Sequence, residues 1–149
     1  MPTITGHSSN SANTIALNLT IPNTASVDDV AWMVVIDAGL ESRTVSNVWT
    51  LAESGEIINF MWHRYYRVLT SGDPGSTVTL TRTVASSAKV SAAIFTMSNV
   101  DHTQPESANT VVSSQNYAAS SRPNPTTTAG GGDIISVVFT RGGTPPTVW

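Results

Sequence analysis

The stretch Val30-Ala31-Trp32-Met33-Val34-Val35-Ile36 is the longest apolar run in the chain and decides the fold. Seven residues is the length of a strand, whereas a membrane-spanning helix needs about 20 apolar residues. Asp28-Asp29 precedes the run, and Asp37-Ala38-Gly39 marks a turn after it. A short continuous apolar run between turn signals is typical of a strand buried on both faces. We therefore place residues 30–36 in the core of a β-sandwich.

The strands around this run show period-two alternation, which indicates one buried face. In residues 14–21 the buried set is Ile15, Leu17, Leu19 and Ile21. In residues 57–69 the even positions carry the apolar side chains, namely Ile58, Phe60, Trp62, Tyr66 and Val68, with Arg64 as the exception. This pattern predicts one long strand that buries its even face and exposes Tyr65.

Further strands are predicted at residues 48–52, 77–81, 90–97 and 134–139, with a weaker segment at Val111-Val112. Ser54-Gly55 and Ser71-Gly72-Asp73-Pro74-Gly75 are turn signals, because proline fixes φ and glycine tolerates positive φ. No long stretch sustains helical periodicity with caps. The predicted fold class is all-β: an antiparallel, jelly-roll-like β-sandwich of about eight strands with little or no helix.

The 149 residues match one domain in length. Residues 1–13 are polar and rich in Ser and Asn, so we expect an N-terminal arm that stays disordered until a partner holds it. Residues 14–149 are expected to form the single β-sandwich domain.

Composition narrows the choice of partners. Only 11% of residues are charged and the net charge is −3, so no basic surface is expected that would hold a nucleic acid backbone. Ser and Thr together number 40, and Lys occurs once. There is no cysteine, and the N-terminus has neither the cationic start nor the apolar core of a signal peptide. We expect neither nucleic acid nor membrane as a partner.

No motif for chemistry is apparent. His7, His63 and His102 are too far apart in sequence to form a ligand-spaced pair, so no metal site is predicted. The sequence lacks the Gly-x-Ser-x-Gly motif of a nucleophilic serine. The carboxylates are interpreted as turn and strand-end residues; these are Asp28, Asp29, Asp37, Glu41, Glu53 and Glu56. We predict no catalytic, cofactor-binding or metal-binding residues, no cofactor, and a protein that is not an enzyme.

The order of several segments resembles a β-rich repeat of tailed-phage virion proteins and phage-derived bacterial reading frames. The resemblance spans residues 27 to 149. It is carried by Asp29-Val30 with the strand ending at Asp37-Ala38-Gly39, Val48-Trp49-Thr50-Leu51, Tyr66-Arg67-Val68, Ser71-Gly72-Asp73-Pro74-Gly75-Ser76, Ser98-Asn99-Val100-Asp101 with Pro105, and Gly132-Asp133-Ile134. These are mostly turn and core residues, so they indicate the fold more than the role.

Within that group, the chain resembles a capsid decoration (cement) protein. The resemblance implies a structural virion protein that is made in the host cytoplasm and located on the capsid surface. It would assemble as a homo-oligomer, most commonly a homotrimer, and bridge major capsid protein subunits. The alternative is a receptor- or glycan-binding module of a phage tail fibre or baseplate, which would expose an aromatic patch.

Protein contacts are expected at three places. The polar arm contributes Thr3, Ile4, Thr5 and His7, and the exposed strand face contributes Tyr65. The C-terminal segment contributes Pro145, Pro146, Val148 and Trp149. Val148 and Trp149 are predicted to pack on, or complete a sheet with, a neighbouring subunit. Trp32 and Trp62 lie inside strand patterns and are expected to be buried in the core.

Overall fold

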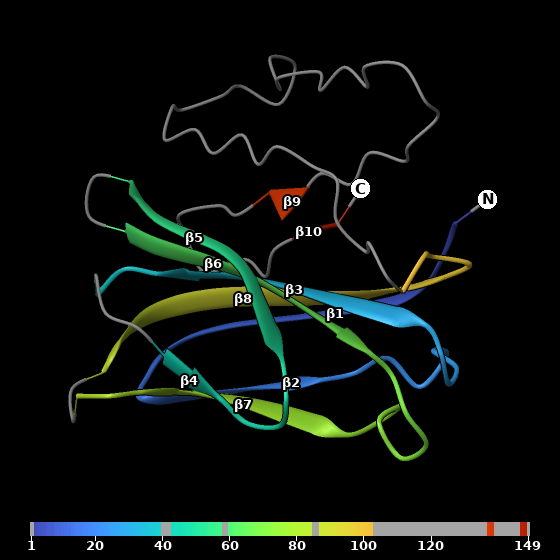
Figure 1. The fold of residues 1–149 in the computed structure, drawn as a ribbon. Helices are drawn as coiled ribbons and strands as arrows, with labels where there is room; N and C mark the ends of the chain where they lie inside the picture. Colours follow the sequence, from blue (N-terminus) through green and yellow to red (C-terminus); the bar gives the residue numbers. More distant parts are fainter. Residues whose placement is uncertain are drawn as a thin grey trace, which may run out of the picture.

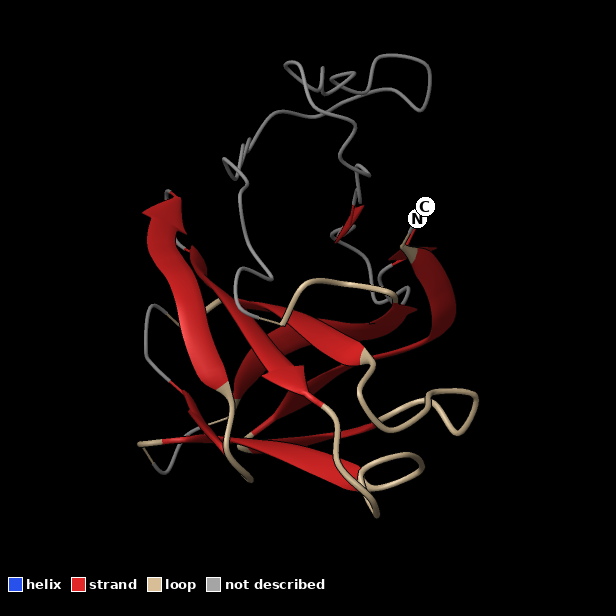
Figure 2. Cartoon of the chain, turned by 45° about the vertical axis from the view of Figure 1, so that its right-hand side comes forward, coloured by secondary structure: helices blue, strands red, loops and turns tan. Residues whose placement is uncertain are grey.

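The computed structural model describes residues 2–39, 43–57, 60–84, 87–102, 137–138 and 147–148. Within them, all regular structure is β-strand (Figure 2). The eight longer strands are β1 (Thr3–Thr14), β2 (Ala16–Thr20), β3 (Val30–Asp37), β4 (Arg43–Val45), β5 (Thr50–Ile57), β6 (Phe60–Val68), β7 (Thr77–Arg82) and β8 (Ala88–Ser98). Two short strands, β9 (Val137–Val138) and β10 (Thr147–Val148), pair with each other.

The eight longer strands form two antiparallel sheets that stack as the layers of a sandwich (Figure 1). The larger sheet has the order β1-β8-β3-β6-β5, and the smaller sheet has the order β2-β7-β4. The predicted all-β, antiparallel sandwich is therefore confirmed.

The main core lies between the facing sides of the two sheets. Alternate residues of each strand point inward because the side-chain period of a strand is two. The smaller sheet contributes Leu17, Leu19, Val78 and Leu80, and the larger sheet contributes Ala31, Met33, Val35, Tyr65, Val90, Ala92 and Ile94. Ile21, Ala25 and Leu69 complete the set. As predicted, Leu17, Leu19 and Ile21 are buried, but Ile15 at the β1–β2 turn is exposed.

A second apolar cluster lies on the opposite face of the larger sheet. Val30, Trp32, Phe95 and Met97 are buried there, with Tyr66 and Val68 packed against them. Strand β3 thus contributes buried side chains to both faces, as expected for the run that begins at Val30. The β9–β10 pair lies on this side of the larger sheet (Figure 1).

The prediction for residues 57–69 was wrong in two respects. The segment is not one strand, because β5 runs through Ser54-Gly55 to Ile57 and pairs with β6, which starts at Phe60. The face toward the main core is the odd one, where His63 and Tyr65 are buried. Both faces of β6 contact apolar neighbours, so alternation of apolar residues alone did not identify the inner face.

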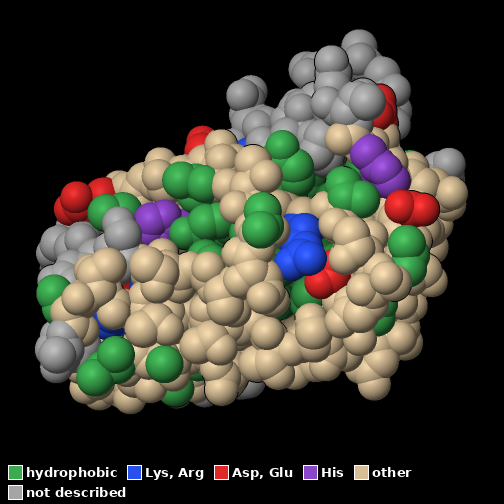
Figure 3. Space-filling model, turned by 60° about the horizontal axis from the view of Figure 1, so that its bottom comes forward, with side chains coloured by type: hydrophobic (Ala, Val, Ile, Leu, Met, Phe, Trp, Pro, Cys, Tyr) green, Lys and Arg blue, Asp and Glu red, His purple; other side chains and the backbone are tan. Residues whose placement is uncertain are grey.

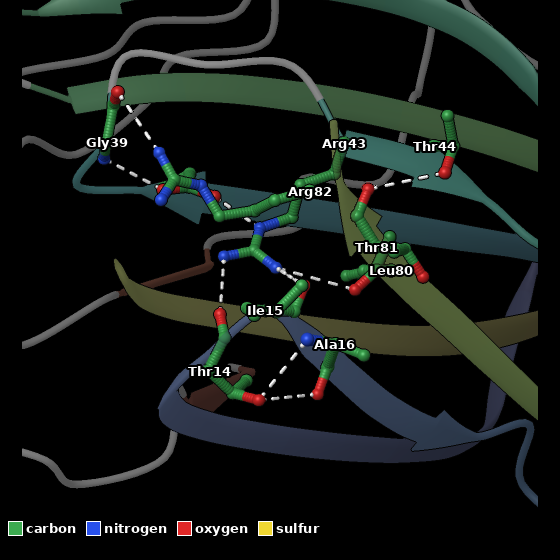
Figure 4. A network of polar contacts seen from close by, with 10 residues as sticks. Thr14, Ile15, Ala16, Gly39, Arg43, Thr44, Leu80, Thr81 and Arg82 are labelled. Atoms are coloured by element: carbon green, nitrogen blue, oxygen red, sulfur yellow. Dashed lines mark hydrogen bonds and ion pairs between the residues drawn. The ribbon is translucent and has the colours of Figure 1, made fainter. Parts of the chain in front are cut away.

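A buried ion pair lies where β1 turns into β2 (Figure 4). The carboxylate of Asp37, at the end of β3, accepts a hydrogen bond from Arg43 Nε, and both side chains are almost fully buried. Arg43 Nη1 donates to the carbonyl of Ile15 at 2.8 Å, and Nη2 donates to that of Thr14 at 3.1 Å. Asp37 Oδ1 accepts the backbone N–H of Gly39 at 2.8 Å. Buried charges are stable only when they are paired and hydrogen-bonded. Here the Asp37–Arg43 pair and its hydrogen bonds connect both sheets to the β1–β2 turn.

Candidate protein-contact surface

Four of the predicted contact residues, Thr3, Ile4, Thr5 and His7, lie together on β1. This strand corrects the prediction that residues 1–13 form a free arm. β1 pairs with β8 along its whole length, from Thr3 opposite Ser98 to Thr14 opposite Ala88. Polar side chains do not prevent this, because the pairing is made by backbone groups. The β-branched Thr3-Ile4-Thr5 was a sequence signal for a strand that the Ser/Asn-rich composition obscured.

Side chains on the inner face of β1 fix it to the rest of the sandwich. Thr5 Oγ1 donates to Asp29 Oδ2 at 2.8 Å and lies 2.9 Å from Thr96 Oγ1. Asn10 Nδ2 donates to the carbonyl of Asn18 at 2.8 Å, and Ser8 Oγ donates to that of Thr20. These bonds reach β2, so β1 closes one side of the sandwich.

Gly6 is required for this packing. A Cβ atom at Gly6 would lie 2.3 Å from Thr24 Oγ1 and 2.6 Å from Pro22 Cβ. Both distances are shorter than non-bonded contacts of a Cβ atom allow. The backbone of β1 therefore contacts the loop after β2 directly. The strand register also shifts between Ile4 and Gly6, as in a β-bulge.

The opposite edge of β1 is unpaired among the described strands, because β1 ends the order of its sheet. Residues of an antiparallel edge strand alternately direct their backbone groups toward the neighbour and away from it. Ser11 donates its backbone N–H to Asn10 Oδ1, and its Oγ lies 2.9 Å from Ser91 Oγ. Ser11 therefore directs its backbone groups outward, and by alternation so do His7 and Ser9.

This edge carries no Asp, Glu, Lys or Arg. Its twelve residues read TITGHSSNSANT, and every one of them is exposed or partly exposed. Edge strands are commonly protected by charged residues, by proline or by short length. None of these protects β1 within its bounds. Seen from the side of the smaller sheet, the surface of the sandwich also carries few Lys, Arg, Asp and Glu side chains (Figure 3).

The other predicted contact residues are not on this edge. Tyr65 was predicted to be exposed, but it is 8% exposed in the main core, where burial raises the pKa of its hydroxyl. Val148 lies on β10 opposite Val137 of the same chain. Pro145, Pro146 and Trp149, like Val111-Val112 and Glu41, lie outside the described residues.

Three carboxylates of the described residues, those of Asp29, Glu53 and Asp73, form hydrogen bonds or ion pairs that hold turns and strands together. Asp29 accepts hydrogen bonds from the backbone N–H of Ser26 and from Thr5 Oγ1. Glu53 Oε2 forms an ion pair with Arg64 Nη2 at 3.1 Å. Burial acts to raise the pKa of Asp73, but bonds from Thr70 and the Arg67 charge outweigh it, so the pKa is lowered. No cluster of three or more potential metal ligands occurs among the described residues.

The three histidines lie in different surroundings. His7 is exposed on β1, and His102 Nε2 lies 2.7 Å from the carbonyl of Asp28. His63 is buried on the inner face of β6, and neither of its ring nitrogens has a hydrogen-bond partner among the described residues. Burial lowers the pKa of His63, and the nearby Asp37 carboxylate opposes this only in part.

Three aromatic residues of the larger sheet, Trp32, Tyr66 and Phe95, pack on one another. Trp32 is stacked on Phe95 with 6.4 Å between ring centroids, and its ring lies 5.7 Å from that of Tyr66. The guanidinium of Arg64 lies 5.9 Å from the Trp32 ring. Trp32 is buried as predicted, whereas Trp62 is only partly buried. These residues form a packed cluster rather than an open stacking platform.

Together these features define an antiparallel β-sandwich with an edge strand, β1, whose outward edge carries no Asp, Glu, Lys or Arg and has no partner among the described strands. No family model, curated protein or solved structure matches the chain. None of the described residues forms a helix of the length and apolarity needed to cross a membrane.

Proposed function

We propose that this chain is a structural virion protein that binds the outside of a phage capsid and stabilises it by bridging major capsid protein subunits. The resemblance of its segments to phage virion proteins supplies the identity of the partner. The structural observation that supports a binding role is the long, uncharged outward edge of β1, which has no partner among the described strands. We further propose that the chain acts without catalysis, as a homo-oligomer such as a trimer.

Several features support binding through many modest contacts. The surface is rich in hydroxyl groups, which form hydrogen bonds without the desolvation cost of charges. Contacts repeated over a capsid lattice add through effective concentration, so each one alone can be weak. The charge balance disfavours binding to nucleic acid.

The test is binding of the purified chain to capsids of the parent phage that lack it, followed by cryo-EM of the decorated particles. We expect density for the sandwich on the outer surface of the head, in contact with more than one major capsid subunit. Decorated heads should also withstand heating better than bare heads. Density on the tail alone, or a specific glycan hit without head binding, would replace this proposal by the tail-fibre or baseplate module.

A further inference from the structure

We infer that the outward edge of β1 is a pairing surface for β1 of a second copy of this chain. Such a contact would join two larger sheets into one continuous antiparallel sheet across a twofold axis. It does not depend on the proposed capsid role, and it differs from the trimer contact that the resemblance implies.

The outward backbone groups of β1, which have no partner strand among the described residues, point to an extended polypeptide as the ligand. His7 and Ser9 direct their N–H and C=O groups outward, by alternation from Ser11. An outward row of unpaired donors and acceptors is a template for another strand. The side chains that could cap these groups are engaged elsewhere, because Ser8 and Asn10 donate to carbonyls of β2.

The chemistry of the strand favours a second copy as the partner. β1 has no charged residue apart from His7, which is ionisable, so antiparallel pairing with itself puts no fixed like charges opposite each other. An isologous contact needs a surface that is complementary to itself, and alternating free donors and acceptors meet that requirement. The chain also contains no cysteine, so any disulfide between two copies must come from an introduced thiol.

The same groups fix the register. The N–H of Ser11 is already bound by Asn10 Oδ1, so the free window lies between His7 and Ser9. The twofold axis should therefore pass at Ser8, with Ser8 opposite Ser8 and His7 opposite Ser9. Opposed residues of this kind have Cα atoms about 4.5–5.5 Å apart, within the range that a disulfide spans. The two Ser11 residues would be about 20 Å apart, because they are offset by six residues.

The experiment compares two variants that differ only in position, Ser8→Cys and Ser11→Cys. Both positions are partly exposed, and both substitutions replace Oγ by Sγ. Under mild oxidation we expect Ser8→Cys to form a disulfide-linked dimer in most of the protein, and Ser11→Cys to form at least tenfold less. Equal cross-linking of the two variants, or none in either, overturns the proposal.

A second measurement compares the mass in solution of the wild-type chain with that of a variant in which the β1 edge is blocked. Light scattering should give a mass of twice the 15.7 kDa chain, or of six chains where the β1 contact joins two of the proposed trimers. Ser9→Pro removes an outward N–H but no bond to β8, so it should halve the mass while thermal unfolding stays cooperative. A monomeric wild-type chain at high concentration, or a trimer that Ser9→Pro leaves intact and Ser8→Cys does not cross-link, contradicts the β1 contact.

Discussion

The Asp37–Arg43 pair and the outward edge of β1 differ in how their polar groups are satisfied. The buried pair is charged, and each side chain has partners within the chain, including carbonyls of Thr14 and Ile15. The edge of β1 is uncharged, and its outward groups at His7 and Ser9 lack a partner strand among the described residues. The comparison separates polar groups that hold the fold from polar groups that remain available for binding.

Breaking the buried Asp37–Arg43 pair should lower the free energy of unfolding more than substitutions at Gly6 or His63. Asp37→Asn removes the charge that neutralises Arg43, and leaving one buried charge unpaired costs about 3–5 kcal/mol. We expect this loss in the free energy of unfolding measured with urea. The matched control is Glu53→Gln, which makes the same chemical change in a pair whose carboxylate is 39% exposed. The control should lose about 1 kcal/mol or less.

If the two variants lose the same free energy of unfolding, the Asp37–Arg43 pair does not hold the β1–β2 turn. That result would contradict the structural role given to the buried pair.

A smaller effect is expected where β1 packs on the loop after β2. Gly6→Ala places a methyl group against Thr24 and Pro22, and overpacking of this kind costs about 1–3 kcal/mol. Ser9→Ala, on the outer face of the same strand, should change the free energy of unfolding by less than about 0.5 kcal/mol. Thermal unfolding of both variants checks this. A Gly6→Ala protein as stable as wild type would show that β1 does not pack there.

The effect of pH should be smaller still and specific to His63. Because burial lowers its pKa in the folded chain below 6.5, the unfolded chain binds more protons below that pH. The free energy of unfolding should therefore fall as pH decreases from 7 toward 5, and level off below the folded pKa. His63→Met should flatten this slope, whereas His7→Gln, at an exposed position, should preserve it. A slope that both variants retain would assign the dependence to other groups.

Some of the fold followed from the sequence for clear physical reasons. Val30 to Ile36 is apolar on both faces, and β3 is indeed enclosed by two clusters. The turn at Asp73-Pro74-Gly75 is predictable because glycine tolerates a positive φ, and Gly75 adopts a φ of 78°. Strand order was not predictable, because pairing of β1 with β8 joins residues that are 74 (Thr14 and Ala88) to 95 (Thr3 and Ser98) positions apart.

The errors also have physical causes. Tyr65 was predicted to be exposed because β6 carries apolar side chains on its even face, and only the position of the smaller sheet decides which face is inner. The polar side chains of residues 1–13 predict an arm, but the prediction is wrong because backbone pairing with β8 makes Thr3–Thr14 a strand. Of the predicted contact residues, Thr3, Ile4, Thr5 and His7 lie on the candidate edge strand, and Tyr65 lies in the core.

Residue-specific hydrogen exchange of the β1 amides tests the central claim most directly, in protein dilute enough to be dissociated. The account predicts alternation: Ser8, Asn10 and Ala12, bonded to β8, exchange slowly, while His7 and Ser9 exchange at least ~10-fold faster. Raising the protein concentration should slow His7 and Ser9 selectively. Uniformly fast exchange from Thr3 to Thr14 would contradict the account, because it would mean that β1 is a free arm.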